Sequence, residues 1–181
     1  FVDGLHLFVE MPDDKFEPRI ADQRIGYFSE KVTDLSTYDS NNARDLINRW
    51  RLVKKDPDAE LSEPEQPLVY WVENSTPEEI RPFVVKGIEA WNKAFEKAGF
   101  KNAIVAKIQP DDAEWDAGDV RYNVVRWAST PSPRYSGYGP SVANPRTGEI
   151  IAADIVQEFN AIKRGYTYRK LWGYTEENDP L

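Results

Sequence analysis

The clearest hydrophobic pattern lies between residues 67 and 100. Residues 67–72 form a near-continuous apolar run, which is typical of a strand buried on both faces of a sheet. Apolar side chains then recur at spacings of four and three residues, which predicts an amphipathic helix that packs in the core. These side chains are Ile80, Val84, Ile88, Trp91, Phe95 and Ala98.

The two ends of this helix carry further signals. Thr76 and Pro77 are favourable at a helix start, and Glu79 can complete a capping box. Gly99 is typical of a helix C-terminus. Pro82 lies beyond the first turn of a helix that begins at Thr76, so it predicts either a kink or a later start.

Further strands are expected after the helix, over residues 102–108, 120–127, 138–143 and 149–156. Pro140 has no N–H to donate, so its strand is expected at a sheet edge. Residues 144–148, Asn-Pro-Arg-Thr-Gly, predict a turn. The pattern therefore predicts an α+β fold, in which a mixed sheet of about five strands packs on one long helix.

The segment before this region, residues 1–66, reads as an extended N-terminal arm with short strands and a linker. Short strands are expected over residues 24–28 and 47–52, and the charged, proline-containing residues 54–66 indicate the linker. Residues 67–181 would form the second part. That part ends in a mixed pattern, interpreted as a helix to residue 162 followed by an aromatic tail with Tyr166, Tyr168, Trp172 and Tyr174.

Composition limits the chemistry that this chain can perform. The net charge is −8, which disfavours binding to nucleic acid or to an anionic membrane surface. No apolar run is long enough to span a bilayer. There is no cysteine and a single histidine, His6, so neither a thiolate metal site nor a site with several histidines can form. His6 is either a ligand or base, or a partly exposed residue of the arm.

Two other groups of residues leave alternatives open. The acidic side chains between Asp111 and Asp119 either bind calcium or form a solvated loop, and their spacing does not match an EF-hand. The tail aromatics either stack on sugars or pack against the rest of a larger protein.

Several stretches together carry a resemblance. They are residues 22–28, 47–57, 91–100 and 144–151, and also Asp119-Val120, Arg126-Trp127, Tyr138-Gly139-Pro140 and Thr147-Gly148-Glu149-Ile150. The last four resemble strands three to five of metzincin zinc peptidases. The first four, in this order, resemble large bacterial zinc-dependent metallopeptidases that are periplasmic or surface-attached and carry an uncharacterised region ahead of a metzincin-like catalytic domain.

This resemblance implies the N-terminal part of a zinc metallopeptidase, in which a zinc-activated water cleaves a peptide bond. The zinc-binding motif of the family, His-Glu-x-x-His-x-x-Gly-x-x-His, is absent, so we expect it beyond Leu181 and expect this chain alone to be inactive. The chain then supplies no catalytic residue and no metal ligand. Zinc would belong to the complete protein, and the partners would be a peptide or protein substrate and the remainder of the catalytic domain.

In the family the fourth strand pairs with the substrate. The resemblance therefore implies a substrate-binding edge made of Gly137, Tyr138, Gly139, Pro140, Ser141, Val142 and Ala143. A strand edge blunted against aggregation by Pro140 is the alternative. A non-catalytic periplasmic or secreted module that binds peptide or glycan is the second functional hypothesis, and a purely structural domain is the third.

Overall fold

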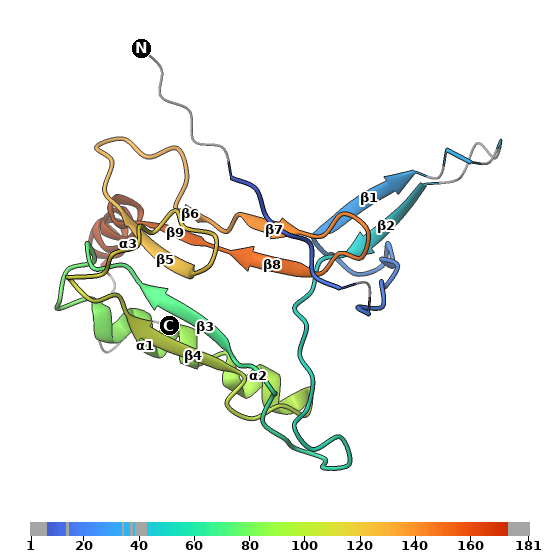
Figure 1. Ribbon diagram of the computed structural model, residues 1–181. Coiled ribbons are helices and arrows are strands. Elements are labelled where there is room, and N and C mark those ends of the chain that lie inside the picture. The colour runs from blue at the N-terminus through green and yellow to red at the C-terminus, as the bar shows by residue number, and fades with distance from the viewer. Residues whose placement is uncertain (1–6, 14, 34, 37, 39–42, 174–181) are drawn as a thin grey trace. The chain divides into compact units, whose positions relative to one another are not determined.

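The computed structural model describes residues 7–13, 15–33, 35–36, 38 and 43–173 (Figure 1). His6 and Tyr174 therefore lie outside the described residues. The chain forms two compact units, and each is described by itself. The smaller unit combines residues up to Arg51 with Ser141–Ile151, and the larger unit combines Leu52–Pro140 with the residues from Ala152 onward.

The larger unit is built on a five-stranded mixed sheet with the order β4-β3-β5-β9-β6. Its strands are β3 (Leu68–Val72), β4 (Ile104–Ile108), β5 (Asn123–Ala128), β6 (Gly137–Tyr138) and β9 (Ile155–Glu158). The first four strands of this order pair in parallel, and β6 pairs antiparallel with β9 at the edge. The predicted α+β class with a mixed sheet of about five strands is confirmed.

The predicted long helix is present as two shorter ones, α1 (Arg81–Glu89) and α2 (Asn92–Lys97). They lie on one face of the sheet, behind β3 and β4 in Figure 1. Pro82 marks the true start, because it occupies the first turn of α1. The predicted cap at Thr76 is wrong: the backbone N–H groups of Ile80 and Arg81 donate to the carbonyl of Pro77 in a turn that precedes the helix, and no side chain caps α1.

The end of α2 follows the prediction. Gly99 has φ +87°, a left-handed conformation that glycine adopts without a steric cost. The N–H of Phe100 donates to the carbonyl of Phe95 at 2.9 Å, and the N–H of Gly99 donates to the carbonyl of Glu96 at 3.0 Å. This pair of bonds is a Schellman motif, which satisfies carbonyls that the helix leaves free.

Both faces of the sheet contribute to the core. Its buried apolar side chains include Leu68, Tyr70, Val72, Ile88, Ile104, Val124 and Val125. Trp71 alternates with Tyr70 and Val72 along β3 and so faces the other side of the sheet. There it meets an aromatic cluster, in which the rings of Trp115 and Tyr122 stack at 3.9 Å and Trp115 meets Trp71 edge-on at 5.4 Å. The acidic loop before β5 is therefore held against the sheet by its aromatic residues.

One edge of this sheet is closed by a side chain. The Asn92 amide donates to the carbonyl of Ile104 at 2.9 Å and accepts from the N–H of Ile104 at 3.1 Å. Both backbone groups of Ile104 belong to the outer edge of β4, so Asn92 takes the place of a neighbouring strand there.

The smaller unit contains one antiparallel strand pair and most of a second two-stranded sheet, whose last two residues, Ala152 and Ala153, belong to the larger unit. β1 (Ser29–Thr33) pairs with β2 (Ala43–Ile47), and β7 (Ser141–Ala143) pairs with β8 (Ile150–Ala153). The arm strands were thus predicted out of place: the first begins at Ser29 rather than within residues 24–28, and residues 48–52 contribute only a bridge between Arg49 and Glu149. The predicted strand over residues 149–156 is divided into β8 and β9.

The last helix, α3 (Phe159–Leu171), runs well past the predicted end at residue 162. Gly165 and Thr167 are weak helix formers, which explains the short prediction. Glu158 caps the N-terminus of α3, and Arg169 and Lys170 in its last turn are favourable at a helix C-terminus. Among the described residues, no helix has the length and apolar character that a membrane span requires.

Candidate functional site

The structure divides the predicted substrate-binding segment between two elements. Gly137 and Tyr138 form β6, the edge strand of the five-stranded sheet, and Gly139 and Pro140 follow it. Ser141, Val142 and Ala143 form β7, which pairs with β8 and does not belong to that sheet. The predicted single strand over residues 138–143 is therefore wrong in its extent, and the candidate edge in the larger unit is Gly137–Pro140.

The register of β6 decides which of its backbone groups point away from β9. Tyr138 is opposite Val156. The carbonyl of Ser136 accepts from the N–H of Glu158 at 3.1 Å, and the carbonyl of Pro140 accepts from the N–H of Asp154 at 3.0 Å. Because direction alternates along a strand, residues 136, 138 and 140 direct their backbone groups toward β9, and Gly137 and Gly139 direct theirs outward.

Pro140 does not blunt this edge. Its missing N–H would have pointed inward, toward β9, so its absence leaves the outward row unchanged. The outward groups belong to two glycines, which carry no side chain that would obstruct an approaching backbone. Gly137 is required for a separate reason: a Cβ at this position would lie 2.8 Å from the carbonyl oxygen of Val156.

An aromatic pair stands beside the edge. The rings of Tyr135 and Tyr138 meet edge-on with centroids 5.2 Å apart, and both side chains are about half exposed. Such a pair offers apolar area at little cost in side-chain entropy, which suits contact with a bound chain.

Two carboxylates attach to the backbone of β5. Asp154, between β8 and β9, accepts from the N–H of Val124 at 3.0 Å, and Glu73 accepts from the N–H of Trp127 at 2.8 Å. Burial raises the pKa of Asp154 above its ordinary value. Burial, together with the Asp154 carboxylate, also raises the pKa of Tyr70 to about 12. Both carboxylates are occupied by main-chain bonds, and in the described part of the chain no three His, Cys, Asp or Glu side chains gather to hold a metal ion.

Glu158 is a fully buried carboxylate at the junction of β9 and α3. It accepts from the N–H of Thr130 at 3.0 Å, from the Thr130 hydroxyl at 2.8 Å and from the N–H of Asn160 at 3.3 Å. Burial alone would raise the pKa of Glu158, but these hydrogen bonds hold it below its ordinary value of 4.5. Glu158 thus fixes both the loop after β5 and the start of α3.

This depressed pKa gives a pH-dependence with a defined sign. The ionised carboxylate stabilises the fold above the unfolded-state pKa of 4.5, and that contribution is lost as the pH falls through the lower folded-state pKa. We expect Glu158→Gln to be less stable than the native protein at neutral pH and to lose less stability below pH 4.5. Urea unfolding at a series of pH values measures this, with exposed Glu78→Gln as the control. Parallel pH profiles for Glu158→Gln and the native protein would contradict it.

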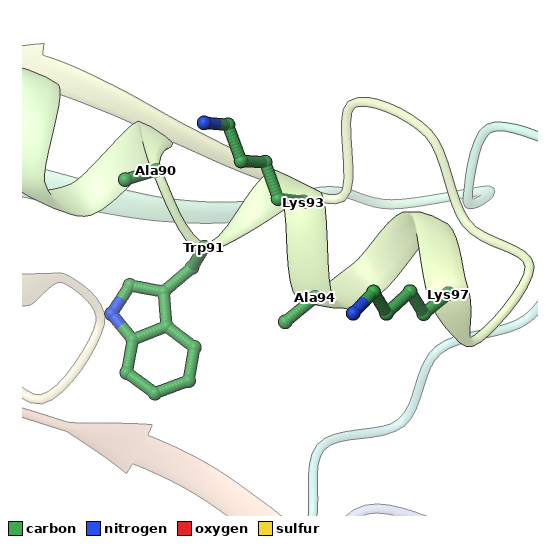
Figure 2. Close-up of a pocket in the computed structure, with 5 residues that line it drawn as sticks. All are labelled: Ala90, Trp91, Lys93, Ala94 and Lys97. Atoms are coloured by element: carbon green, nitrogen blue, oxygen red, sulfur yellow. The ribbon is translucent and has the colours of Figure 1, made fainter.

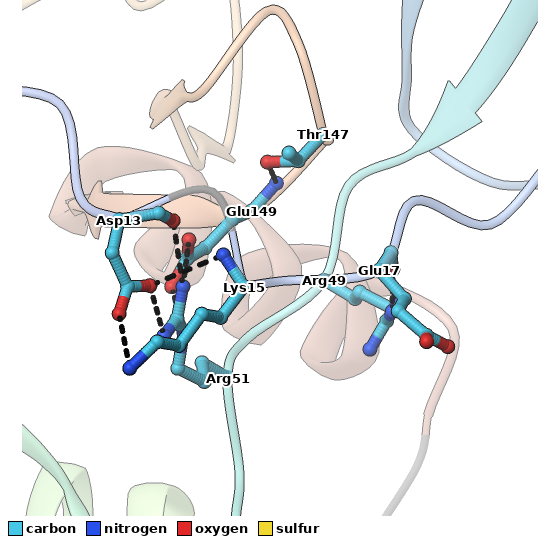
Figure 3. A network of polar contacts seen from close by, with 7 residues as sticks. All are labelled: Asp13, Lys15, Glu17, Arg49, Arg51, Thr147 and Glu149. Carbon is cyan, nitrogen blue, oxygen red and sulfur yellow. Dashed lines mark hydrogen bonds and ion pairs between the residues drawn. The ribbon is translucent and has the colours of Figure 1, made fainter.

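In the smaller unit, a polar network surrounds Arg51 (Figure 3). Its guanidinium forms a fork with Glu149, from Nε to Oε1 at 2.6 Å and from Nη2 to Oε2 at 2.9 Å, and Nη1 donates to Asp13 at 2.7 Å. These bonds raise the pKa of Arg51, and the bond from Arg51 lowers the pKa of Asp13. The guanidinium of Arg49 lies 4.0 Å from the ring centroid of buried Phe16 and donates to the carbonyl of Glu17.

The sequence pattern did not predict this network. Residues 47–52 were expected to form a short strand, whereas the Arg51 side chain extends to a carboxylate nearly a hundred residues away. The only available signal was Glu149 in the Thr-Gly-Glu turn. The contacts are ionic and aromatic, and within the network the buried Nε–H of Arg49 has no hydrogen-bond partner among the described residues. We interpret the network as a structural element.

Comparison with known proteins gives one match. The family model described as "Domain of unknown function (DUF5117)" matches residues 4–55. No curated protein and no solved structure matches the chain. The matched residues include Phe16, Arg49 and Arg51, and exclude the five-stranded sheet with its β6 edge.

Proposed function

We propose that this chain is the N-terminal part of a metzincin-like zinc metallopeptidase and that β6 binds an extended stretch of the substrate. The order of elements in the larger unit supports this: a strand, the helical segment, two strands, a short edge strand and a last strand, as the resemblance implies. The observation that carries the proposal is the row of outward backbone groups at Gly137 and Gly139 on a sheet edge, for which no hydrogen bond is present among the described residues. Such an edge binds a peptide by adding it as a further strand.

In the complete protein, zinc would supply the activated water for hydrolysis. The described residues would orient the substrate: Gly137 and Gly139 would pair with its backbone, and Tyr135 and Tyr138 would contact its side chains. The complete protein would be periplasmic or surface-attached, with the remainder of the catalytic domain as the partner of this chain. Because no group of described residues fits zinc, we expect no hydrolysis of peptides by this chain with added zinc.

Peptide binding tests the proposal directly. Fluorescein-labelled decapeptides that together cover casein serve as probes, and anisotropy reports binding. We expect Gly139→Pro, which removes the outward N–H, to weaken binding about tenfold. Pro140→Ala is the matched control, because it adds only an inward N–H and leaves the outward row intact.

A second probe avoids any effect of substitution on folding. N-methylation of alternate amides in the best-binding peptide removes its own donors, and one of the two methylation registers should abolish binding. The proposal is wrong if no casein peptide binds, or if Gly139→Pro and both methylated peptides bind as tightly as the originals. Peptide turnover above background by this chain with zinc would overturn the expectation of inactivity.

A further inference from the structure

The sheet edge at β6 is accessible over its whole length. Gly137, Tyr138, Gly139 and Pro140 are all exposed. β6 ends the strand order of its sheet, and among the described residues its strand partner is β9 alone. The outward row therefore leaves room for a partner strand of three residues, whose first and third residues would exchange hydrogen bonds with the two glycines.

The same chain carries an exposed segment with the composition of a strand, Leu7-Phe8-Val9-Glu10-Met11. Leu7, Phe8 and Met11 are 53%, 94% and 45% exposed. In the structure these five residues belong to no helix and no strand. Phenylalanine and valine favour strands, and Pro12 ends the segment. Three large apolar side chains exposed within five residues form a surface that favours association.

One antiparallel register matches the segment to the edge. In this register Leu7–Val9 lies along Gly137–Gly139, and Phe8 is opposite Tyr138. The two rings then form a pair without hydrogen bonds between their backbones, in which side chains approach most closely, and aromatic pairs across strands are favourable. The residues on either side of Phe8 lie opposite glycines, which leave space for them. A shift of two residues would instead place the Glu10 carboxylate against Tyr138.

We propose that residues Leu7–Met11 of one copy of this chain bind the β6 edge of a second copy as an added strand. An exposed strand edge and an exposed strand-forming segment in one chain are the elements from which copies exchange strands. The contact is short, so the association is weak. The inference rests on the proposed function, because it uses the same outward row of β6, and it adds regulation: the segment competes with the substrate for the edge.

A hollow beside Trp91 is the alternative place for Phe8 (Figure 2). It measures about 350 Å³ and lies at the break between α1 and α2. Its lining residues are Ala90, Trp91, Lys93, Ala94 and Lys97. Trp91 is 64% exposed, which makes the prediction of a core position wrong for this residue.

The hollow differs from the edge in its backbone groups. The N–H groups of Trp91, Lys93 and Ala94 donate to carbonyls within the helical turns. Figure 2 also shows that Lys93 points away from Trp91, so its ammonium group does not face the indole ring. Binding in the hollow would therefore depend on the Phe8 ring and on Trp91. It would not depend on an N–H of the segment.

Self-association of the whole chain is the first test, measured by sedimentation velocity from about 10 µM to about 1 mM. We expect the average mass of the native chain to rise with concentration. Val9→Pro removes an N–H that faces β6 in the proposed register and should weaken association about tenfold. Glu10→Pro is the matched control, because the N–H of Glu10 points away from β6. Gly139→Pro should weaken association as Val9→Pro does, and Trp91→Ala should leave it unchanged.

A fluorescein-labelled peptide with the sequence of residues 5–13 is the second test, and it separates this inference from the proposed function. Anisotropy with the Val9→Pro chain, whose own segment is impaired, should show binding that Gly139→Pro weakens about tenfold. The peptide should also displace bound casein peptides. If it binds and no casein peptide does, the proposed function is wrong and the inference holds.

The opposite result removes the inference and leaves the proposed function intact: casein peptides bind through β6, but the peptide of residues 5–13 does not. A native chain that stays monomeric at about 1 mM overturns the inference as well. Equal association of the Val9→Pro and Glu10→Pro chains has the same consequence. Loss of association in Trp91→Ala would place the segment in the hollow and would also overturn it.

Discussion

Replacing Gly148 by alanine is expected to destabilise the smaller unit by about 2–4 kcal/mol, the sum of a left-handed backbone and a steric overlap. Gly148 has φ +73°, and an added Cβ would lie 2.4 Å from the carbonyl oxygen of Ile47. That neighbour is main chain and has no rotamer to change. The N–H of Arg49 donates to the carbonyl of Gly148 at 3.0 Å, so a shift of the turn would also break this bond.

Amide hydrogen exchange at Ile47 and Arg49 measures the effect within the unit. Both N–H groups are bonded there, that of Ile47 to the carbonyl of Arg19 at 2.8 Å. The control is Gly26→Ala, because a Cβ at Gly26 meets no atom within 4 Å. It should stay within about 0.5 kcal/mol of the native protein. Equal exchange rates in the Gly148 and Gly26 variants would show that the turn does not pack on Ile47 as described.

Local residue types were sufficient to predict this turn, but they did not predict which segment the turn packs against. Asn144 to Gly148 were predicted as a turn from residue type alone, and the structure confirms it. That the turn meets Ile47 is a contact between segments about a hundred residues apart, and no local pattern encodes such a contact. The same reason explains why Arg51 was not connected with Glu149.

Burial of apolar side chains was predicted correctly where the element that covers them belongs to this chain. The apolar run of β3 and the position of Ile88 were right because sheet and helix cover each other. Trp91 occupies the same stripe, yet it is exposed and lies at the break between α1 and α2. Hydrophobic periodicity identifies the apolar face of a helix, but it does not identify the surface against which that face packs.

The candidate edge strand was also predicted only in part. Pro140 predicted an edge, and β6 confirms one in the larger unit. Which backbone groups are free depends on the register with β9, and a shift of one residue would exchange the inward and outward sets. Sequence alone therefore named Gly137 and Gly139 among the candidates but could not distinguish them from Tyr138.

Replacing Arg51 by methionine is expected to cost about 2–3 kcal/mol in the smaller unit, because it leaves a buried carboxylate without its cation. The side chain of Glu149 is only 7% exposed, and Arg51 provides both of its ion-paired hydrogen bonds. Methionine keeps most of the aliphatic length of arginine, so the loss reports the charge and the fork rather than packing. Hydrogen exchange at Ile47 and Arg49 again supplies the measurement.

The matched control is Arg24→Met. Arg24 forms an equally close fork with Asp22, but both side chains are exposed, so its loss should cost less than about 0.5 kcal/mol. The double variant Arg51→Met/Glu149→Gln should recover part of the loss, because it removes the unpaired charge. If Arg51→Met and Arg24→Met cost the same, water replaces the guanidinium and the network contributes little. Recovery of stability in the double variant would show that the segment matched by the family model, residues 4–55, depends for its stability on a turn outside the match. Ser141–Ile151 would then belong to the same folding unit as that segment.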